Sequence, residues 1–173
     1  HNESTQDDKY HVTVRSAGTC MSGGPLNESI ILDVMKYMNK MGDIDIDNMT
    51  VVTEPGVFYR DFEKKTLLQG LLYPGFPASK DICAMGGIVG NNGAGEKTLM
   101  YGKAEDYVVE LETVLADGSI AVFGEITADE LTVKIALSTK EGQVYRDLKS
   151  LIDTNYDLIM NAKPKVSKNS AGY

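Results

Sequence analysis

Two stretches of the chain are rich in glycine and other small residues, and their composition suits the binding of an anion or a planar ligand. The first glycine segment (residues 15–24, RSAGTCMSGG) directly follows a short run of β-forming residues. A phosphate group needs several backbone N–H donors that converge on it, and small residues let the main chain approach it closely. The segment is therefore a candidate pyrophosphate site, with a plain turn as the alternative. It matches neither the lysine-bearing P-loop nor GxGxxG, which disfavours a kinase or a Rossmann dehydrogenase.

The second glycine segment (residues 74–95) contains PGFPASKD followed by ICAMGGIVGNNGAG. Its last half combines glycines with Asn91 and Asn92, and such a stretch can approach a planar ligand and hydrogen-bond its ring or phosphate oxygens. A tightly packed helix end with a turn is the alternative. A third candidate stretch, residues 168–173 (KNSAGY), has no interpretation from physical chemistry alone.

The elements around these segments indicate an α+β domain. β-forming residues and the turn signal Asp117-Gly118 predict strands and hairpins, whereas helical periodicity and a terminal Gly70 predict helices. The predicted strands and hairpins lie at 11–15, 29–34, 44–54 and 107–123, and the predicted helices at 57–69, 127–139 and 143–155. Because these elements do not alternate strictly, a mainly antiparallel sheet with flanking helices is favoured over a doubly wound parallel sheet. A nucleotide site in such a fold has to come from loops.

Composition narrows the class of partner. The chain has 173 residues, of which 42% are hydrophobic, and its net charge of −8 comes from interspersed acids and bases. This balance argues against a nucleic-acid groove or an anionic membrane surface as partner. Cys20 and Cys83 are too few for a disulfide framework or a zinc cluster, so a reducing, cytoplasmic location and no metal site are expected. No stretch of the sequence is long and apolar enough to predict a membrane span.

Six landmarks occur in order along the chain. They are RSAGT with SGG, the dipeptide Pro55-Gly56, FPASKD with GGIVGNNGAGE, the dipeptide Tyr101-Gly102, VLADG at 114–118 and NSAGY at 169–173. Together they resemble the PCMH-type FAD-binding domain of the FAD-linked oxidases, a family that includes glycolate oxidase subunits, D-lactate dehydrogenases and D-2-hydroxyglutarate dehydrogenases. The resemblance is far more specific than any one landmark.

The resemblance implies FAD as the cofactor. The main-chain amides of the first glycine segment would wrap its pyrophosphate, and the second segment would line the isoalloxazine and ribityl part. In such proteins the flavin accepts the hydride, and the protein supplies orientation and electrostatics. The implied cofactor-binding residues are Arg15, Ser16, Ala17, Gly18, Thr19, Cys20, Met21, Ser22, Pro77, Ala78, Ser79, Asp81, Cys83, Met85, Gly86, Gly87, Val89, Asn91, Asn92, Gly95 and Tyr101. For Tyr101, an interior position with a satisfied hydroxyl is the alternative.

The resemblance also bears on how FAD is held. Relatives with covalent flavin often use a histidine in the first glycine segment, where this chain has Cys20 and no histidine. Cys83 lies near the position from which a cysteine attaches flavin in some doubly linked relatives, and a small buried thiol is the alternative. We therefore expect non-covalent FAD.

The resemblance further sets an expected domain layout. The chain begins with His1 rather than Met, and residues 1–11 form a polar lead-in that would end a truncated first lobe. Residues 12–173 would form the FAD-binding domain, incomplete at its C-terminal end. The catalytic residues are unassigned, because the resemblance places the substrate-binding cap outside this chain.

The implied function is oxidation of a D-2-hydroxy acid, of the D-lactate or glycolate type, by hydride transfer to FAD. The chain would then be the cofactor domain of a dehydrogenase or oxidase with a small-molecule substrate and an unassigned electron acceptor. Two alternatives stay open. One is a flavoenzyme similar to alkyl-dihydroxyacetone-phosphate synthase, and the other is a flavin-holding module of a complex without a substrate site of its own.

Overall fold

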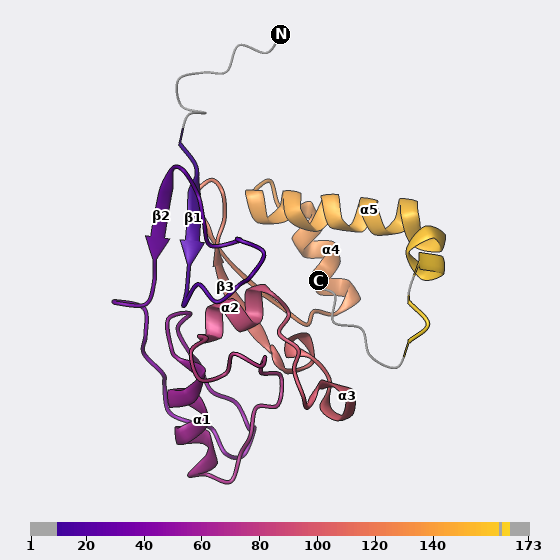
Figure 1. The fold of residues 1–173 in the computed structure, drawn as a ribbon. Helices are drawn as coiled ribbons and strands as arrows, with labels where there is room; N and C mark the ends of the chain where they lie inside the picture. The colour runs from indigo at the N-terminus through magenta and orange to yellow at the C-terminus, as the bar shows by residue number, and fades with distance from the viewer. Residues whose placement is uncertain (1–9, 163, 167–173) are drawn as a thin grey trace. The chain divides into compact units, whose positions relative to one another are not determined.

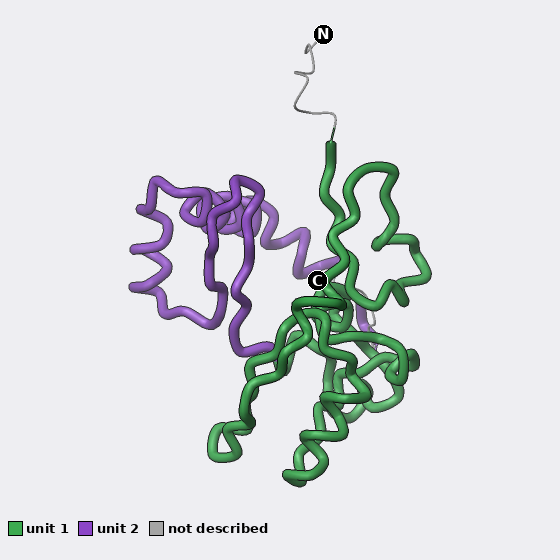
Figure 2. The backbone as a smooth tube through the Cα atoms, turned by 90° about the vertical axis from the view of Figure 1, so that its left-hand side faces the viewer, with its two compact units in different colours: residues 1–107, 170–173 green, residues 108–169 purple. Residues whose placement is uncertain are grey.

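The computed structural model describes residues 10–162 and 164–166 of the chain (Figure 1). Of these, the residues up to Tyr107 form one compact unit and those from Val108 onward form a second (Figure 2). The start of the polar lead-in, residues 1–9, and the NSAGY landmark lie outside the described residues. Each unit has its own helices and its own pair of strands.

In the first unit, β1 (Val12–Arg15) and β2 (Ile30–Asp33) form a two-stranded parallel sheet (Figure 1). Both strands confirm the prediction from the sequence, but their parallel pairing departs from the mainly antiparallel arrangement that was expected. The connecting residues 16–29 give the physical reason. A connection of this length brings the chain back to the start of the partner strand, which a tight hairpin turn does not do.

The hairpin expected over residues 44–54 does not form a regular ladder. The chain folds back there through isolated antiparallel bridges, such as the one between Asp45 and Thr50. The Asp45 carboxylate accepts hydrogen bonds from the main-chain and side-chain nitrogens of Asn48, at 3.0 and 2.8 Å. Such local side-chain bonds compete with a strand ladder, so the segment is a turn rather than a pair of strands.

Helix α1 (Tyr59–Leu67) confirms the helix predicted at 57–69. Tyr59 and Phe62 lie on its buried face. The Tyr59 side chain is fully buried, and its ring centroid lies 5.2 Å from that of Phe76. Aromatic packing of this kind stabilises the core beyond simple burial, and it holds α1 against the start of the second glycine segment.

Part of the second glycine segment is helical, which agrees with the alternative of a packed helix end and turn. Helix α2 (Met85–Gly90) contains glycines, which are poor helix formers. Met85 and Ile88 are only 5% and 2% exposed, and their burial outweighs the low propensity. Two short turns follow, α3 (Thr98–Tyr101) and a 3₁₀ helix at Ala104–Tyr107.

The second unit consists of a hairpin and two helices, namely β3 (Glu110–Val114), β4 (Ile120–Gly124), α4 (Ala128–Ala136) and α5 (Lys140–Ala162). The predicted hairpin and helices are confirmed. Gly118 has the φ of +81° that its turn requires, and Thr127 forms a capping box with Glu130 at the start of α4. Helix α5 is longer than predicted and kinks at Asn155. Neither it nor any other helix in the described part of the chain is long and apolar enough to cross a bilayer.

Candidate cofactor-binding site

The first glycine segment leaves β1 and turns at two glycines in the left-handed region. Gly18 has a φ of +70° and Gly23 a φ of +80°, a conformation that other residues rarely adopt. Within the described part of the chain, the amides of Ala17, Gly18 and Thr19 donate to no protein acceptor. Consecutive amides in such a turn make a concave site for an anion.

The Arg15 side chain folds back over this turn. A Cβ atom added to Gly18 would lie 2.5 Å from the Arg15 Cζ atom, so the guanidinium covers the open face of that glycine. No carboxylate of residues 10–162 or 164–166 forms an ion pair with it. A guanidinium that has no ion-pair partner among the described residues, next to a cluster of amides, suits a phosphate group. The segment therefore fits the pyrophosphate of FAD.

Cys20 lies in the same segment with its sulfur among hydrogen-bond donors. Its Sγ atom is 2.9 Å from the Ser22 hydroxyl oxygen. Hydrogen bonds from the side chain and main chain of Ser22, followed by the Gly24 amide and the Asn91 side chain, lower the pKa of the Cys20 thiol.

The second glycine segment contains both buried and accessible members of the predicted set. Cys83, Met85 and Asn92 are 2%, 5% and 1% exposed, so their side chains belong to the interior. Burial raises the pKa of the Cys83 thiol, which makes it a poor nucleophile. Tyr101 is 48% exposed, which contradicts the alternative of an interior tyrosine. The other residues are at least partly accessible, namely Pro77, Ala78, Ser79, Asp81, Gly86, Gly87, Val89, Asn91 and Gly95.

Asn92 makes its hydrogen bonds inside the protein. Its side-chain nitrogen donates to a Glu105 carboxylate oxygen at 2.6 Å, and its side-chain oxygen accepts from the Glu105 main-chain N–H at 3.0 Å. Glu105 also pairs with Lys103 at 3.0 Å. A buried amide needs such partners, so Asn92 ties the turn after α2 to the following 3₁₀ helix. Glu105 was missed at the sequence level, because nothing local distinguishes it among 25 acidic residues.

Several glycines of the second segment are required by close packing within the protein. A Cβ atom at Gly93 would lie 2.9 Å from a side-chain carbon, and one at Gly95 would overlap the Phe76 carbonyl oxygen. Gly87 differs from them, since the nearest atom to its added Cβ is the Ser16 Cβ, at 4.0 Å. The face of Gly87 is therefore turned toward the first glycine segment.

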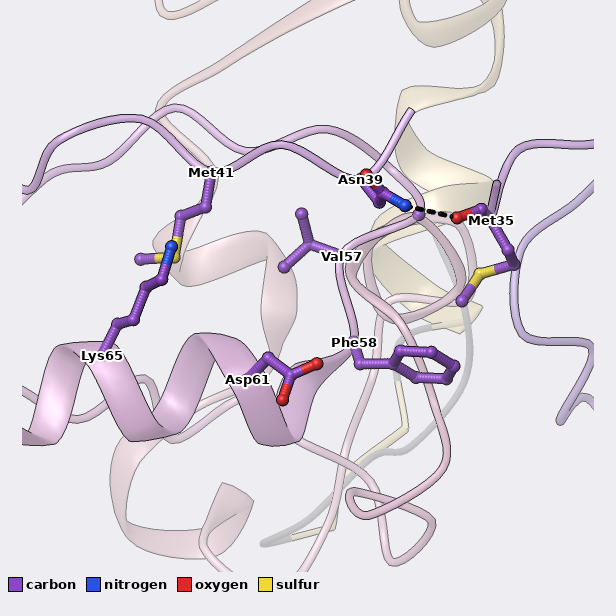
Figure 3. A pocket seen from close by; sticks show the side chains of 8 residues that line it. Met35, Asn39, Met41, Val57, Phe58, Asp61 and Lys65 are labelled. Carbon is purple, nitrogen blue, oxygen red and sulfur yellow. Dashed lines mark hydrogen bonds between the residues drawn. The ribbon is translucent and has the colours of Figure 1, made fainter. Parts of the chain in front are cut away.

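A cavity of about 240 Å³ lies elsewhere in the first unit, beside α1 (Figure 3). Its described lining residues are Met35, Asn39, Met41, Gly56, Val57, Phe58, Asp61 and Lys65. The Asn39 amide donates to the Met35 carbonyl at 2.8 Å, as the dashed line shows. None of these lining residues belongs to the predicted cofactor set, so the cavity and the candidate cofactor site are separate.

Comparison with known proteins assigns the family. Residues 4–124 match the family model of an FAD binding domain. The chain belongs to this FAD-binding family. The match confirms the resemblance to the FAD-linked oxidases and identifies FAD as the cofactor of the domain.

Two relatives show the extent of the sequence similarity. The chain is 38% identical over 111 residues to the glycolate oxidase subunit GlcD of Bacillus subtilis, a match that covers 63% of this chain and 23% of the relative. It is 35% identical over 115 residues to a D-lactate dehydrogenase of Archaeoglobus fulgidus, covering 65% of this chain and 25% of the relative. The chain thus spans about a quarter of each of these curated relatives.

A solved structure supports the fold. The structure of 6-hydroxy-D-nicotine oxidase from Arthrobacter nicotinovorans matches with a TM-score of 0.61 at 26% identity. The match covers 72% of this chain and 27% of that structure. The α+β fold of a PCMH-type FAD-binding domain is thereby confirmed.

Proposed function

We propose that the whole protein is an FAD-dependent dehydrogenase or oxidase that takes a hydride from a D-2-hydroxy acid, of the D-lactate or glycolate type. The observation that carries the proposal is a run of main-chain amides at residues 17–19 beside the Arg15 guanidinium, in a chain of an FAD-binding family. These amides donate to no acceptor in the part of the chain that the structure describes. The substrate class is supported by two relatives, a glycolate oxidase subunit and a D-lactate dehydrogenase.

The first glycine segment would hold the pyrophosphate of FAD. The chain carries a net charge of −8, so a dianion gains nothing from the overall field of the protein and depends on local donors. The amides of Ala17, Gly18 and Thr19 are such donors, and Arg15 adds the positive charge. Cys20, Met21 and Ser22 would complete the turn around the phosphates.

The second glycine segment would border the ribityl chain and the ring. Its accessible residues, among them Val89 and Asn91, would contact the cofactor directly. Cys83, Met85 and Asn92 would support the segment from inside the unit, because their side chains are buried. Bound there, the flavin would accept the substrate's hydride, while the protein orients both partners and excludes water.

The FAD would be held without a covalent bond. The Cys83 side chain is 2% exposed and its thiol pKa is raised by burial, so its thiolate is scarce and shielded. His11 precedes β1, outside the first glycine segment, and its main-chain N–H donates to the Ser29 hydroxyl. A denatured protein mass equal to that of the polypeptide alone is the expected result, and a mass increase equal to FAD would contradict it.

Reduction of the flavin in the full-length protein tests the substrate class. D-lactate, D-2-hydroxyglutarate and glycolate are added separately to the FAD-loaded protein without oxygen, with L-lactate as the matched control. We expect at least one of the first three to bleach the oxidised-flavin absorbance and L-lactate to leave it unchanged. Bound FAD that no small 2-hydroxy acid reduces would contradict the proposal. That outcome would favour the alkyl-dihydroxyacetone-phosphate synthase-like alternative or a flavin-holding module.

The protein would work in the reducing cytoplasm with a small-molecule substrate and without a nucleic-acid partner. Cys20 and Cys83 are both free thiols, as a reducing compartment favours. The negative net charge opposes binding to a phosphate backbone.

A further inference from the structure

One main-chain carbonyl joins the two glycine segments, and we infer that this junction sets the distance between the subsite for the FAD pyrophosphate and the subsite for its ribityl-flavin part. The Pro55 carbonyl oxygen accepts a hydrogen bond from the Ser16 hydroxyl at 2.9 Å and another from the Gly86 amide at 2.9 Å. Ser16 belongs to the first glycine segment and Gly86 to the second. We call these three residues the Pro55 bridge. The inference rests on the proposed FAD site.

The centre of the bridge has little freedom to move. The ring of Pro55 restricts its own φ. A Cβ atom added to the next residue, Gly56, would lie 2.5 Å from the Val34 carbonyl oxygen and 2.6 Å from that of Met38. The Gly56 amide also donates to the Met38 carbonyl at 2.7 Å. The chain at Pro55 is therefore held tightly against the turn that follows β2.

Ser16 and Gly86, the two donors of the bridge, are packed as closely as Pro55. A Cβ atom at Gly86 would lie 2.6 Å from the Pro55 Cβ and 2.9 Å from the Pro55 oxygen, so only glycine keeps this spacing. The Ser16 hydroxyl lies 3.8 Å from the Met35 sulfur as well as near the Pro55 oxygen. The side chain of Ser16 is thus committed to the protein, and its role is to position its segment.

This spacing matters because FAD occupies both subsites at once. When the pyrophosphate is bound, the ribityl-flavin part binds as an intramolecular event whose strength depends on the separation of the two subsites. Loss of the bridge leaves each subsite intact but lets their separation vary. A ligand that spans both subsites then loses affinity, whereas a ligand that occupies one does not.

The first test compares FAD with ADP, which carries the adenosine and diphosphate but no ribityl-flavin part, in the full-length protein freed of flavin. We expect Ser16→Ala to weaken FAD binding about tenfold, the effect of one lost hydrogen bond, and to weaken ADP binding much less. Ser16→Thr keeps the hydroxyl and should restore FAD affinity. Ser29→Ala is the matched control, since it removes a serine hydroxyl that accepts a main-chain N–H at 3.0 Å outside the bridge.

The second test pushes the two subsites apart, whereas Ser16→Ala removes the hydrogen bond that fixes their separation. Gly86→Ala should weaken FAD binding more than Ser16→Ala does and again weaken ADP binding much less. Its control is Gly90→Ala in the same helix, where an added Cβ meets no atom within 4 Å. Equal losses of FAD and ADP affinity in Ser16→Ala, or no loss of either, would overturn the inference.

A separate readout distinguishes failure of the bridge from failure of the proposed function. Wild-type protein that binds neither FAD nor ADP would contradict the proposed FAD site. Hydrogen exchange at the Gly86 amide still tests the bridge in that case, because the Ser16 hydroxyl fixes the carbonyl to which this amide donates. Faster exchange in Ser16→Ala than in Ser29→Ala supports the bridge, and equal exchange overturns it.

Discussion

The two glycine segments resemble each other in composition but use their glycines for opposite purposes. In the first, Gly18 turns the chain so that the amides at residues 17–19 have no acceptor among the described residues, and Arg15 lies over the turn. In the second, Gly93 and Gly95 let the main chain pack against the rest of the unit. Small residues therefore leave main-chain amides without an acceptor in the described part of one segment and allow close packing in the other.

The largest effect that follows from this contrast is expected at Gly95. An added Cβ would overlap the Phe76 carbonyl oxygen, so the main chain has to shift. Gly95→Ala should lower the free energy of unfolding by about 3 kcal/mol, the upper end for overpacked core sites. Denaturant unfolding measures it, with Gly90→Ala as the control that has free space. Equal stability of the two variants would remove the distinction between the segments.

A smaller effect separates two adjacent asparagines. Asn92→Ala removes both hydrogen bonds to Glu105 and places alanine at a φ of +48°, so we expect a stability loss of about 2 kcal/mol. Asn91→Ala changes an exposed side chain and should alter stability by less than about 0.5 kcal/mol while weakening FAD binding. Thermal unfolding and flavin titration of both variants measure this. A destabilising Asn91→Ala with a neutral Asn92→Ala would reverse the assignment.

The smallest effect is a shift in the pH dependence of thiol alkylation. Hydrogen bonds from Ser22 favour the thiolate of Cys20 and lower its pKa, whereas burial disfavours the thiolate of Cys83 and raises its pKa. Iodoacetamide should therefore modify Cys20 from a lower pH than an ordinary thiol and Cys83 only at a higher one, as peptide mass spectrometry can follow. Ser22→Ala should move the Cys20 midpoint upward. Alkylation of Cys83 before Cys20 would contradict the contrast.

The sequence predicted those elements whose signals are local. The spacing of apolar residues was sufficient for α1, and Asp117-Gly118 was sufficient for the hairpin of the second unit. The helix through Gly86 and Gly87 was only an alternative at the sequence level. Glycine is a poor helix former, and the burial of Ile88 that stabilises the helix is not a local signal. The parallel pairing of β1 and β2 likewise depends on how residues 16–29 return the chain, which no local pattern encodes.

For the candidate site, the ordered motifs predicted which loops would form it. They did not predict the role of each residue in those loops. Nothing in the composition separates Gly18 from Gly95, because the difference lies in which atoms from distant parts of the chain surround each one. Pro55-Gly56 was a landmark without a physical reason at the sequence level. The structure supplies a reason for the glycine, since a Cβ atom at Gly56 would lie 2.5 Å from the Val34 carbonyl oxygen. It also gives the position a role, because the Pro55 carbonyl accepts hydrogen bonds from both glycine segments.

The Pro55 bridge has a consequence for the biosynthesis of the protein. It joins residue 55 to residue 16, 39 positions earlier, and to residue 86 in the second glycine segment. Contacts between such distant positions form late in folding, because closing the loop between them costs entropy before the contact adds any stability. A chain that leaves the ribosome N-terminus first exposes the amides of residues 17–19 long before Gly86 emerges. The two subsites therefore reach their fixed spacing only after residue 86 has been translated.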